Sequence, residues 1–158
     1  MPYQVRAKTA CDAVGYDRDR FNEDVASGAY PCAPPTDQGR PRIFEEPDLI
    51  ALYVHAYLRR MGVGADLSGS IACRVGDQAR QLVNNGKELA GDVVIGWDHV
   101  GSSFCGIGAD VSSTLDRTNN GYGGTFSPMV VSMRFALANV LTVTKQRVEE
   151  LIAPKGED

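Results

Sequence analysis

The sequence lacks the features that mark membrane-spanning and secreted proteins. No apolar run approaches the roughly 20 residues that a transmembrane helix needs. The N-terminal segment has no apolar stretch between a basic start and a small-residue cleavage site, so no secretory signal is expected. We therefore expect a cytoplasmic protein that has no membrane partner.

Cysteine is scarce and widely spaced. The four cysteines form no C-x-x-C pair and have no closely spaced histidine pair as partners, whereas structural zinc sites normally show such local spacing. We therefore expect neither a metal nor a cofactor. In a cytoplasmic setting we expect all four to be reduced thiols, buried as small hydrophobic side chains. They are Cys11, Cys32, Cys73 and Cys105.

An excess of positive charge is absent as well. The formal net charge is -4, whereas strong non-specific nucleic-acid binders are usually basic. This balance still allows a small basic face on an acidic protein. The hydrophobic fraction of 43% and the charged fraction of 23% are ordinary for a globular chain. The 158 residues suit one domain, or a small domain with an appendage.

Two short helices are predicted near the N-terminus. Thr9 is a suitable N-cap for the first helix, which ends at Gly15, where a turn calls for a positive φ. Asp17 can cap the second helix, and Gly28 ends it. On this second helix Phe21 and the valine four positions later share one face, which predicts packing against the first helix.

Residues 29–44 are expected to be an irregular excursion. Four prolines exclude a helix there, and a turn followed by residues 42–44 predicts a small hairpin, or wing. A longer helix then opens with acidic residues around Pro47 and ends at Gly62. His55 lies off the apolar stripe of this helix or at its edge, so we expect a partly exposed surface histidine.

The second half of the chain combines a further helix with a Gly-rich region. Apolar spacing predicts a helix over residues 66–83, which Asn84-Asn85-Gly86 ends. A strand is predicted at residues 92–97, and a weaker one at 100–107. The loop at residues 119–124 is rich in asparagine and glycine, which is typical of a tight turn or a linker.

A last long helix is predicted from Ser127, an N-cap followed by proline, to about Ile152. Several of its residues are spaced alternately four and three apart, as in a short coiled-coil seam. Such a seam serves either self-association or packing on the chain's own domain, and the sequence leaves both open. The seam consists of Leu137, Leu141, Thr144, Val148 and Leu151.

Residues 10–62 carry a set of matched spacings. Gly15 and Gly28 bracket the second helix, and Pro31 follows it. Gly39 with residues 42–44 looks like a wing that leads into an acidic helix start. In this register the segment, about a third of the chain, resembles the winged-helix DNA-binding domain of the MerR family of regulators.

The segment also departs from that family. One extra residue lies between Gly39 and Arg42. Asp19 stands where the family tends to have arginine, and Glu23 and Asp24 stand where it tends to have aromatic residues. Carboxylates repel phosphates, so these positions reduce the positive charge of the expected DNA-contacting helix.

The resemblance implies sequence-specific binding of double-stranded DNA by a homodimeric transcriptional regulator. The second helix would enter the major groove, with Arg18, Arg20 and Asn22 reaching base edges or phosphates. Arg40 and Arg42 on the wing would contact flanking phosphates. Two further possibilities are a phage-type DNA-packaging or recombination-accessory protein, and a protein-interaction module that has lost DNA binding.

The basic residues also have a purely structural interpretation. They can form a solvated helix face balanced by neighbouring carboxylates, for example through an i,i+4 pair between Arg20 and Asp24. An enzymatic site is not expected, because the polar residues near His99 form no known catalytic motif. These residues are Asp98, His99, Ser102, Ser103 and Cys105.

The sequence thus predicts a mainly α protein with small β elements. Residues 1–83 are expected to form the MerR-like winged helix-turn-helix. Residues 84–158 are expected to form a Gly-rich α+β segment that ends in a long helix. This second part would serve association, the sensing of an unknown effector, or contact with a protein partner.

Overall fold

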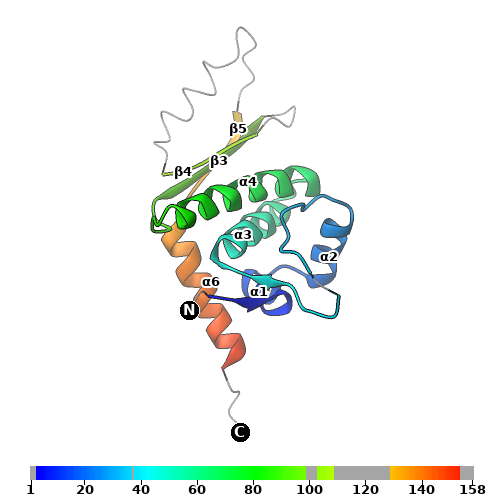
Figure 1. The fold of residues 1–158 in the computed structure, drawn as a ribbon. Helices are drawn as coiled ribbons and strands as arrows, with labels where there is room; N and C mark the ends of the chain where they lie inside the picture. The colour runs from blue at the N-terminus through cyan, green and yellow to red at the C-terminus, as the bar shows by residue number, and fades with distance from the viewer. Residues whose placement is uncertain (1–2, 37, 99–102, 109–128, 154–158) are drawn as a thin grey trace.

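A computed structural model describes residues 3–36, 38–98, 103–108 and 129–153 (Figure 1). In these residues the fold is mainly helical with small β elements, as predicted, and it has five helices and two small antiparallel sheets. Helix α3 (Glu46–Arg60) lies at the centre, and α1, α4 and α6 pack against it (Figure 1). None of the described helices is both long enough and apolar enough to cross a membrane.

The first element is strand β1 (Val5–Arg6), and helix α1 (Ala7–Val14) follows it directly. The prediction that Thr9 caps this helix is wrong, because the helix begins two residues earlier. Its first N–H group, on Ala7, donates to the Arg42 carbonyl at 3.1 Å, so the neighbouring strand takes the place of a side-chain cap. The predicted turn at Gly15 is confirmed by its φ of 68°.

Helix α2 (Arg18–Ala26) follows, with the Asp17 side chain as its cap, as predicted. The Asp17 carboxylate accepts a hydrogen bond of 2.9 Å from the Arg20 backbone N–H. Phe21 is fully buried in the core, and Gly28 adopts a φ of 81° just after the helix. These features confirm the predicted bounds of the second helix to within a residue or two.

Residues 29–42 are here called the arm; the described ones, 29–36 and 38–42, are irregular, and strand β2 (Ile43–Phe44) follows them. The prediction of a hairpin within the arm is wrong, since β2 pairs in antiparallel fashion with β1. The prolines of the arm lack the N–H donors that an internal ladder needs. In the observed pairing Val5 lies opposite Phe44, and both side chains are buried.

Helix α3 starts with a capping box, in which Asp48 accepts a hydrogen bond of 2.9 Å from the Glu45 backbone N–H. Helix α4 (Ala65–Asn84) confirms the predicted fourth helix. Three residues of its predicted apolar stripe are fully buried against α3 and the sheet, and the fourth, Leu82, is half-buried. The three are Ile71, Val75 and Ala79.

The C-terminal sheet has the strand order β4-β3-β5, formed by β3 (Asp92–Asp98), β4 (Ser103–Ile107) and β5 (Met129–Ala136). The predicted strand at residues 92–97 is confirmed, and the one predicted at 100–107 is confirmed over its described residues 103–107, but the predicted start of the last helix is wrong. The residues from Met129 to Ala136 are rich in β-branched and other apolar side chains and pair with β3 along its length. Ser127 and residues 119–124 lie outside the described residues.

Helix α6 (Leu137–Ile152) begins only where this pairing ends. Four of the five seam residues are buried and lie on the face that packs against α1 and α3, whereas Leu151 is 48% exposed. The seam therefore packs within the chain. The same hydrophobic core contains residues from both sides of the predicted boundary at residue 83, including Val54, Val93 and Val148.

Candidate nucleic-acid interface

A buried hydrogen-bond cluster fixes α2 against α3. Asp24 Oδ2 accepts a hydrogen bond of 2.5 Å from the Tyr16 hydroxyl and one of 2.8 Å from His55 Nε2. Arg59 Nε lies 3.9 Å from the same oxygen and donates to the Tyr16 hydroxyl at 3.4 Å. One carboxylate thereby connects the turn after α1, the end of α2 and the central helix.

Two sequence-based expectations fail at this cluster. His55 is fully buried and not a surface residue, because the rings of Tyr16 and Tyr30 cover it at centroid distances of 5.4 and 4.9 Å. The i,i+4 pair of Arg20 with Asp24 does not form, since the Asp24 side chain turns inward. Asp24 is therefore absent from the outer face of α2.

The cluster holds defined charge states. Burial alone would raise the pKa of Asp24, but hydrogen bonds from Tyr16 and His55 lower that pKa below its usual value. Burial also lowers the pKa of His55, despite the hydrogen bond to Asp24. A neutral imidazole thus donates through Nε2 to an ionised carboxylate. The buried Nδ1 atom of His55 has no hydrogen-bond partner among the described residues.

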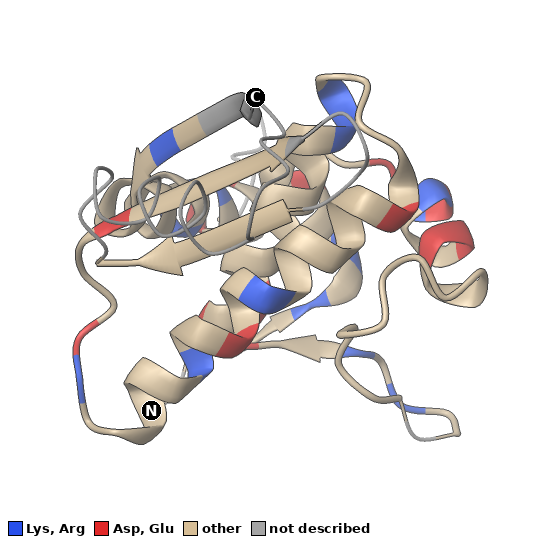
Figure 2. Ribbon diagram, turned by 90° about the horizontal axis from the view of Figure 1, so that it is seen from above, with Lys and Arg blue, Asp and Glu red and all other residues tan. Residues whose placement is uncertain are grey.

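The predicted contact residues of α2 are all exposed, but they do not share one face. Arg18 and Asn22 are four residues apart and lie on one flank, while Arg20 lies on the other. The exposed Asp19 and Glu23 form the ridge between these flanks. Figure 2 shows this mixture of basic and acidic residues on α2.

The two predicted arginines of the arm have different environments. Arg40 is exposed and forms no ion pair with another described residue. Arg42 is half-buried, and its Nη1 atom donates to the Pro34 carbonyl, which closes the base of the arm. Arg6 is not among the predicted contacts. It is exposed on β1 and lies opposite Ile43, the residue that follows Arg42. Only the strand pairing reveals this position.

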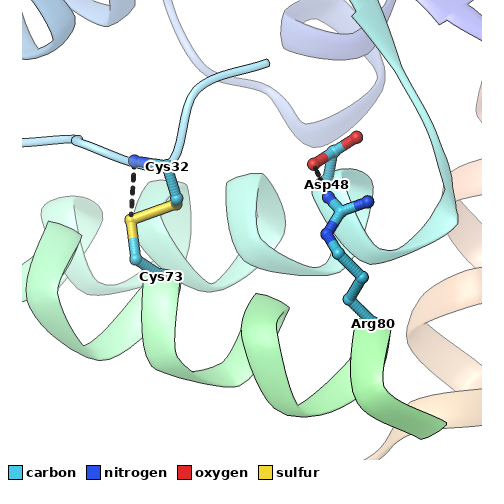
Figure 3. Close-up of a disulfide and its surroundings, with 4 residues drawn as sticks. All are labelled: Cys32, Asp48, Cys73 and Arg80. Atoms are coloured by element: carbon cyan, nitrogen blue, oxygen red, sulfur yellow. Dashed lines mark hydrogen bonds and ion pairs between the residues drawn. A yellow bond between two sulfur atoms is a disulfide. The ribbon is translucent and has the colours of Figure 1, made fainter. Parts of the chain in front are cut away.

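A disulfide between Cys32 and Cys73 joins the arm to α4, with a Cα–Cα distance of 5.4 Å (Figure 3). The expectation of four reduced thiols is therefore wrong for this pair, whose 41-residue separation hides the contact. Cys11 and Cys105 are free. Burial raises the pKa of Cys11 to about 11, as befits an inert core thiol.

Among the described residues of the group considered for catalysis, Ser103 and Cys105 show no sign of an activated nucleophile. Burial raises the pKa of the Cys105 thiol, which keeps it protonated, whereas a nucleophilic cysteine needs a lowered pKa. The Ser103 hydroxyl is bound by Arg74. His99 and Ser102 lie outside the described residues. Across residues 3–36, 38–98, 103–108 and 129–153 no three His, Cys, Asp or Glu side chains are grouped as metal ligands.

The predicted contact residues thus lie on two neighbouring exposed segments, α2 and the arm, next to the β1–β2 pair. The frame beneath them is the Tyr16–Asp24–His55 cluster and the disulfide to α4. In comparisons with known proteins, no protein-family model matches the chain and no curated protein matches it.

Proposed function

We propose that the protein binds double-stranded DNA through α2 and the arm and acts as a sequence-specific transcriptional regulator. The main support is that Arg18, Arg20 and Arg40 are exposed and form no ion pair with any described residue, on elements that a buried cluster and a disulfide hold in place. Exposed arginines on a rigid frame suit phosphate and guanine recognition.

The geometry of α2 favours one flank as the contact surface. Arg18 and Asn22 together offer an arginine for guanine and an amide for adenine. Turning this flank toward the groove moves the acidic ridge of Asp19 and Glu23 away from the phosphates. In this arrangement Arg40 contacts a flanking phosphate, and Arg42 holds the arm closed through its bond to the Pro34 carbonyl.

We further propose that the regulator works in the cytoplasm as a homodimer, because paired half-sites raise affinity and specificity together. The buried residues of the α6 seam are occupied within the chain. The dimer surface would therefore involve other residues. An effector or protein partner would act through the C-terminal part, residues 84–158.

An unbiased selection of duplexes bound by the full chain tests the proposal. Affinity for the selected duplex is then measured by fluorescence anisotropy at several salt concentrations, with Arg18→Ala, Asn22→Ala and Arg40→Ala. We expect each loss of a base contact to weaken binding by about 1–3 kcal/mol, and each loss of a phosphate contact to reduce the salt slope by about one.

Arg147→Ala is the matched control, since Arg147 is exposed on α6, a different helix from α2 (Figure 1). It should bind like the unmodified chain. If all three test variants also bind like the unmodified chain, the surface is misplaced. If no duplex is enriched at all, DNA binding is wrong.

One observation favours a second candidate function. The ridge of Asp19 and Glu23 gives α2 an acidic outer edge that suits a basic protein partner better than DNA. A protein-interaction module of this kind would enrich no duplex. Its binding to a basic partner would weaken on Asp19→Asn or Glu23→Gln, whereas the same changes should strengthen DNA binding by reducing repulsion.

A further inference from the structure

The arm is attached to one face of α4 at two neighbouring points. At Gly69 the helix backbone touches the first residue of the arm so closely that a Cβ atom there would overlap the Ala29 carbonyl oxygen. One turn further along the helix, Cys73 forms the disulfide with Cys32, and the Cys32 N–H group lies 3.3 Å from Cys73 Sγ. The first contact depends on packing and the second on a covalent bond.

The same face of α4 also holds the start of α3. Arg80 lies two turns beyond Cys73, and its Nη2 atom is 2.5 Å from Asp48 Oδ1 (Figure 3). Helix α4 therefore links the arm to the N-terminus of the central helix. A movement of the arm relative to α4 is a movement relative to the whole core.

The disulfide attaches the arm covalently to α4 just before the exposed part of the arm begins. Tyr30 anchors the arm just before it and is fully buried. Beyond Pro34 the described residues are exposed up to Arg40, and the arm is next held at Arg42 by its bond to the Pro34 carbonyl. Because Arg42 and Pro34 both belong to the arm, that bond closes the loop without attaching it to α4.

We propose that the Cys32–Cys73 disulfide is a redox-controlled latch that sets the position of the arm and thereby regulates DNA binding. This inference depends on the function proposed above. Cys32 is half-buried whereas Cys73 is only 7% exposed, so a reductant reaches the bond from the side of Cys32. In a reducing compartment such a bond is transient and therefore suited to regulation.

Opening the latch is a thiol–disulfide exchange with a dithiol reductant. A thiolate of the reductant attacks one protein sulfur, forms a mixed disulfide and releases the other cysteine as a thiolate, which takes up a proton. The second reductant thiol then displaces the first protein sulfur and closes a cyclic disulfide. Two electrons and two protons pass to the protein, which ends with two thiols. A low-molecular-weight disulfide reverses the reaction.

Opening the latch leaves the start of the arm held by the Gly69 contact and Tyr30, and its end held by the bond between the Ala7 N–H and the Arg42 carbonyl, while residues 32–36 lose their covalent attachment to α4. The fraction of molecules whose arm stands in the binding-competent position then falls, and the apparent affinity for DNA falls by the same factor. Residues before Cys32 should be unaffected, because the Tyr30 N–H group remains bonded to the Asp24 carbonyl at 2.9 Å.

The full chain is tested with and without dithiothreitol, and alkylation followed by mass spectrometry reports the state of the cysteines. Hydrogen–deuterium exchange of peptides covering residues 29–36 is measured without DNA, and affinity for the selected duplex is measured in parallel. We expect reduction to speed exchange of the Cys32 N–H group, which donates to Cys73 Sγ while the latch is closed, and to weaken DNA binding by about tenfold. Cys32→Ser/Cys73→Ser should behave as the reduced chain under both conditions, whereas Cys105→Ser should respond like the unmodified chain.

Hydrogen exchange and DNA affinity can each contradict a different part of the proposal. If exchange in the arm is the same in both states, the latch does not exist, whatever DNA binding shows. If exchange changes but affinity does not, the bond is structural and the regulatory proposal is overturned. If no duplex binds in either state, the proposed function fails, and with it the regulation of DNA binding. Exchange then still decides whether the bond positions the arm.

Discussion

His55 Nε2 lies 2.8 Å from Asp24 Oδ2, joining the central helix to α2 across 31 residues of sequence. Both residues are buried, and the carboxylate also accepts a hydrogen bond from Tyr16. Removing one partner of such a pair lowers the stability of the fold, because the other partner stays buried without its hydrogen bond. The orientation of α2 therefore depends on an interior contact and not on its own surface.

Replacing the imidazole tests this dependence. We expect His55→Leu to lower the free energy of unfolding by about 2–4 kcal/mol, because the Asp24 carboxylate keeps its burial and loses a donor. Urea denaturation measures the change. Glu23→Gln, a change at the exposed neighbour of Asp24, should stay within about 0.5 kcal/mol of the unmodified chain. Equal stability of the two variants would show that the buried contact contributes nothing.

The same histidine predicts a pH dependence. Its pKa in the folded state lies below the usual value of 6.5, so the unfolded chain binds more protons between the two values. The His55 contribution to stability is therefore present above 6.5 and is lost as the pH falls below that value. Urea midpoints measured from about pH 8 down to about pH 5.5 should decline, and His55→Gln should flatten the decline. The chain has one other histidine, and a decline removed by His99→Gln instead would assign the effect there.

Helix α4 lies very close to the arm at Gly69 and to α3 at Gly76, so a methyl group added at either position should destabilise the fold, by different amounts. Gly69→Ala should destabilise the fold by about 2–4 kcal/mol, because the overlap is with a backbone carbonyl that cannot rotate away. Gly76→Ala should cost less, about 1–2 kcal/mol, since its Cβ would lie 2.9 Å from the Ala51 side chain. Ser70→Ala on the exposed face should be neutral or slightly stabilising. Thermal denaturation of the three variants gives the order, and equal midpoints would contradict the close packing.

The seam of α6 separates packing within the chain from association. Val148→Ala should cost about 1–2.5 kcal/mol, since Val148 is 3% exposed, while Leu151→Ala should cost under about 0.5 kcal/mol. The loss for Val148→Ala should be independent of protein concentration, which urea denaturation at two concentrations checks. A loss that depends on concentration would instead place the seam in a subunit interface.

Local backbone geometry is predictable from the sequence where one residue determines it. The sequence predicts that Gly15, Gly28, Gly62 and Gly86 end helices, and all four adopt a positive φ. It also predicts that Asp17 caps α2, and its side chain does so. These features depend only on residues within one turn of each other, so they can be read from the sequence alone.

The errors concern contacts between segments far apart in the chain. The pairing of β1 with β2, the burial of His55 and the disulfide at Cys32 depend on which elements become neighbours, and no local pattern encodes that. The error at β5 has a related cause, since apolar spacing fits a helix or a strand and only pairing with β3 decides between them. The proposed DNA contacts were named from local residue types, whereas the helix flank they occupy follows from the burial of Phe21 and Asp24.

Helix α6 completes the core that α1 and α3 begin, with Leu141 and Val148 lying among their buried residues. Residues 1–83 therefore share one core with α6. A chimera that transplants residues 1–83 onto another protein would uncover apolar surface on α1 and α3 unless α6 is moved with them. For protein engineering, the two parts of the chain have to be exchanged together.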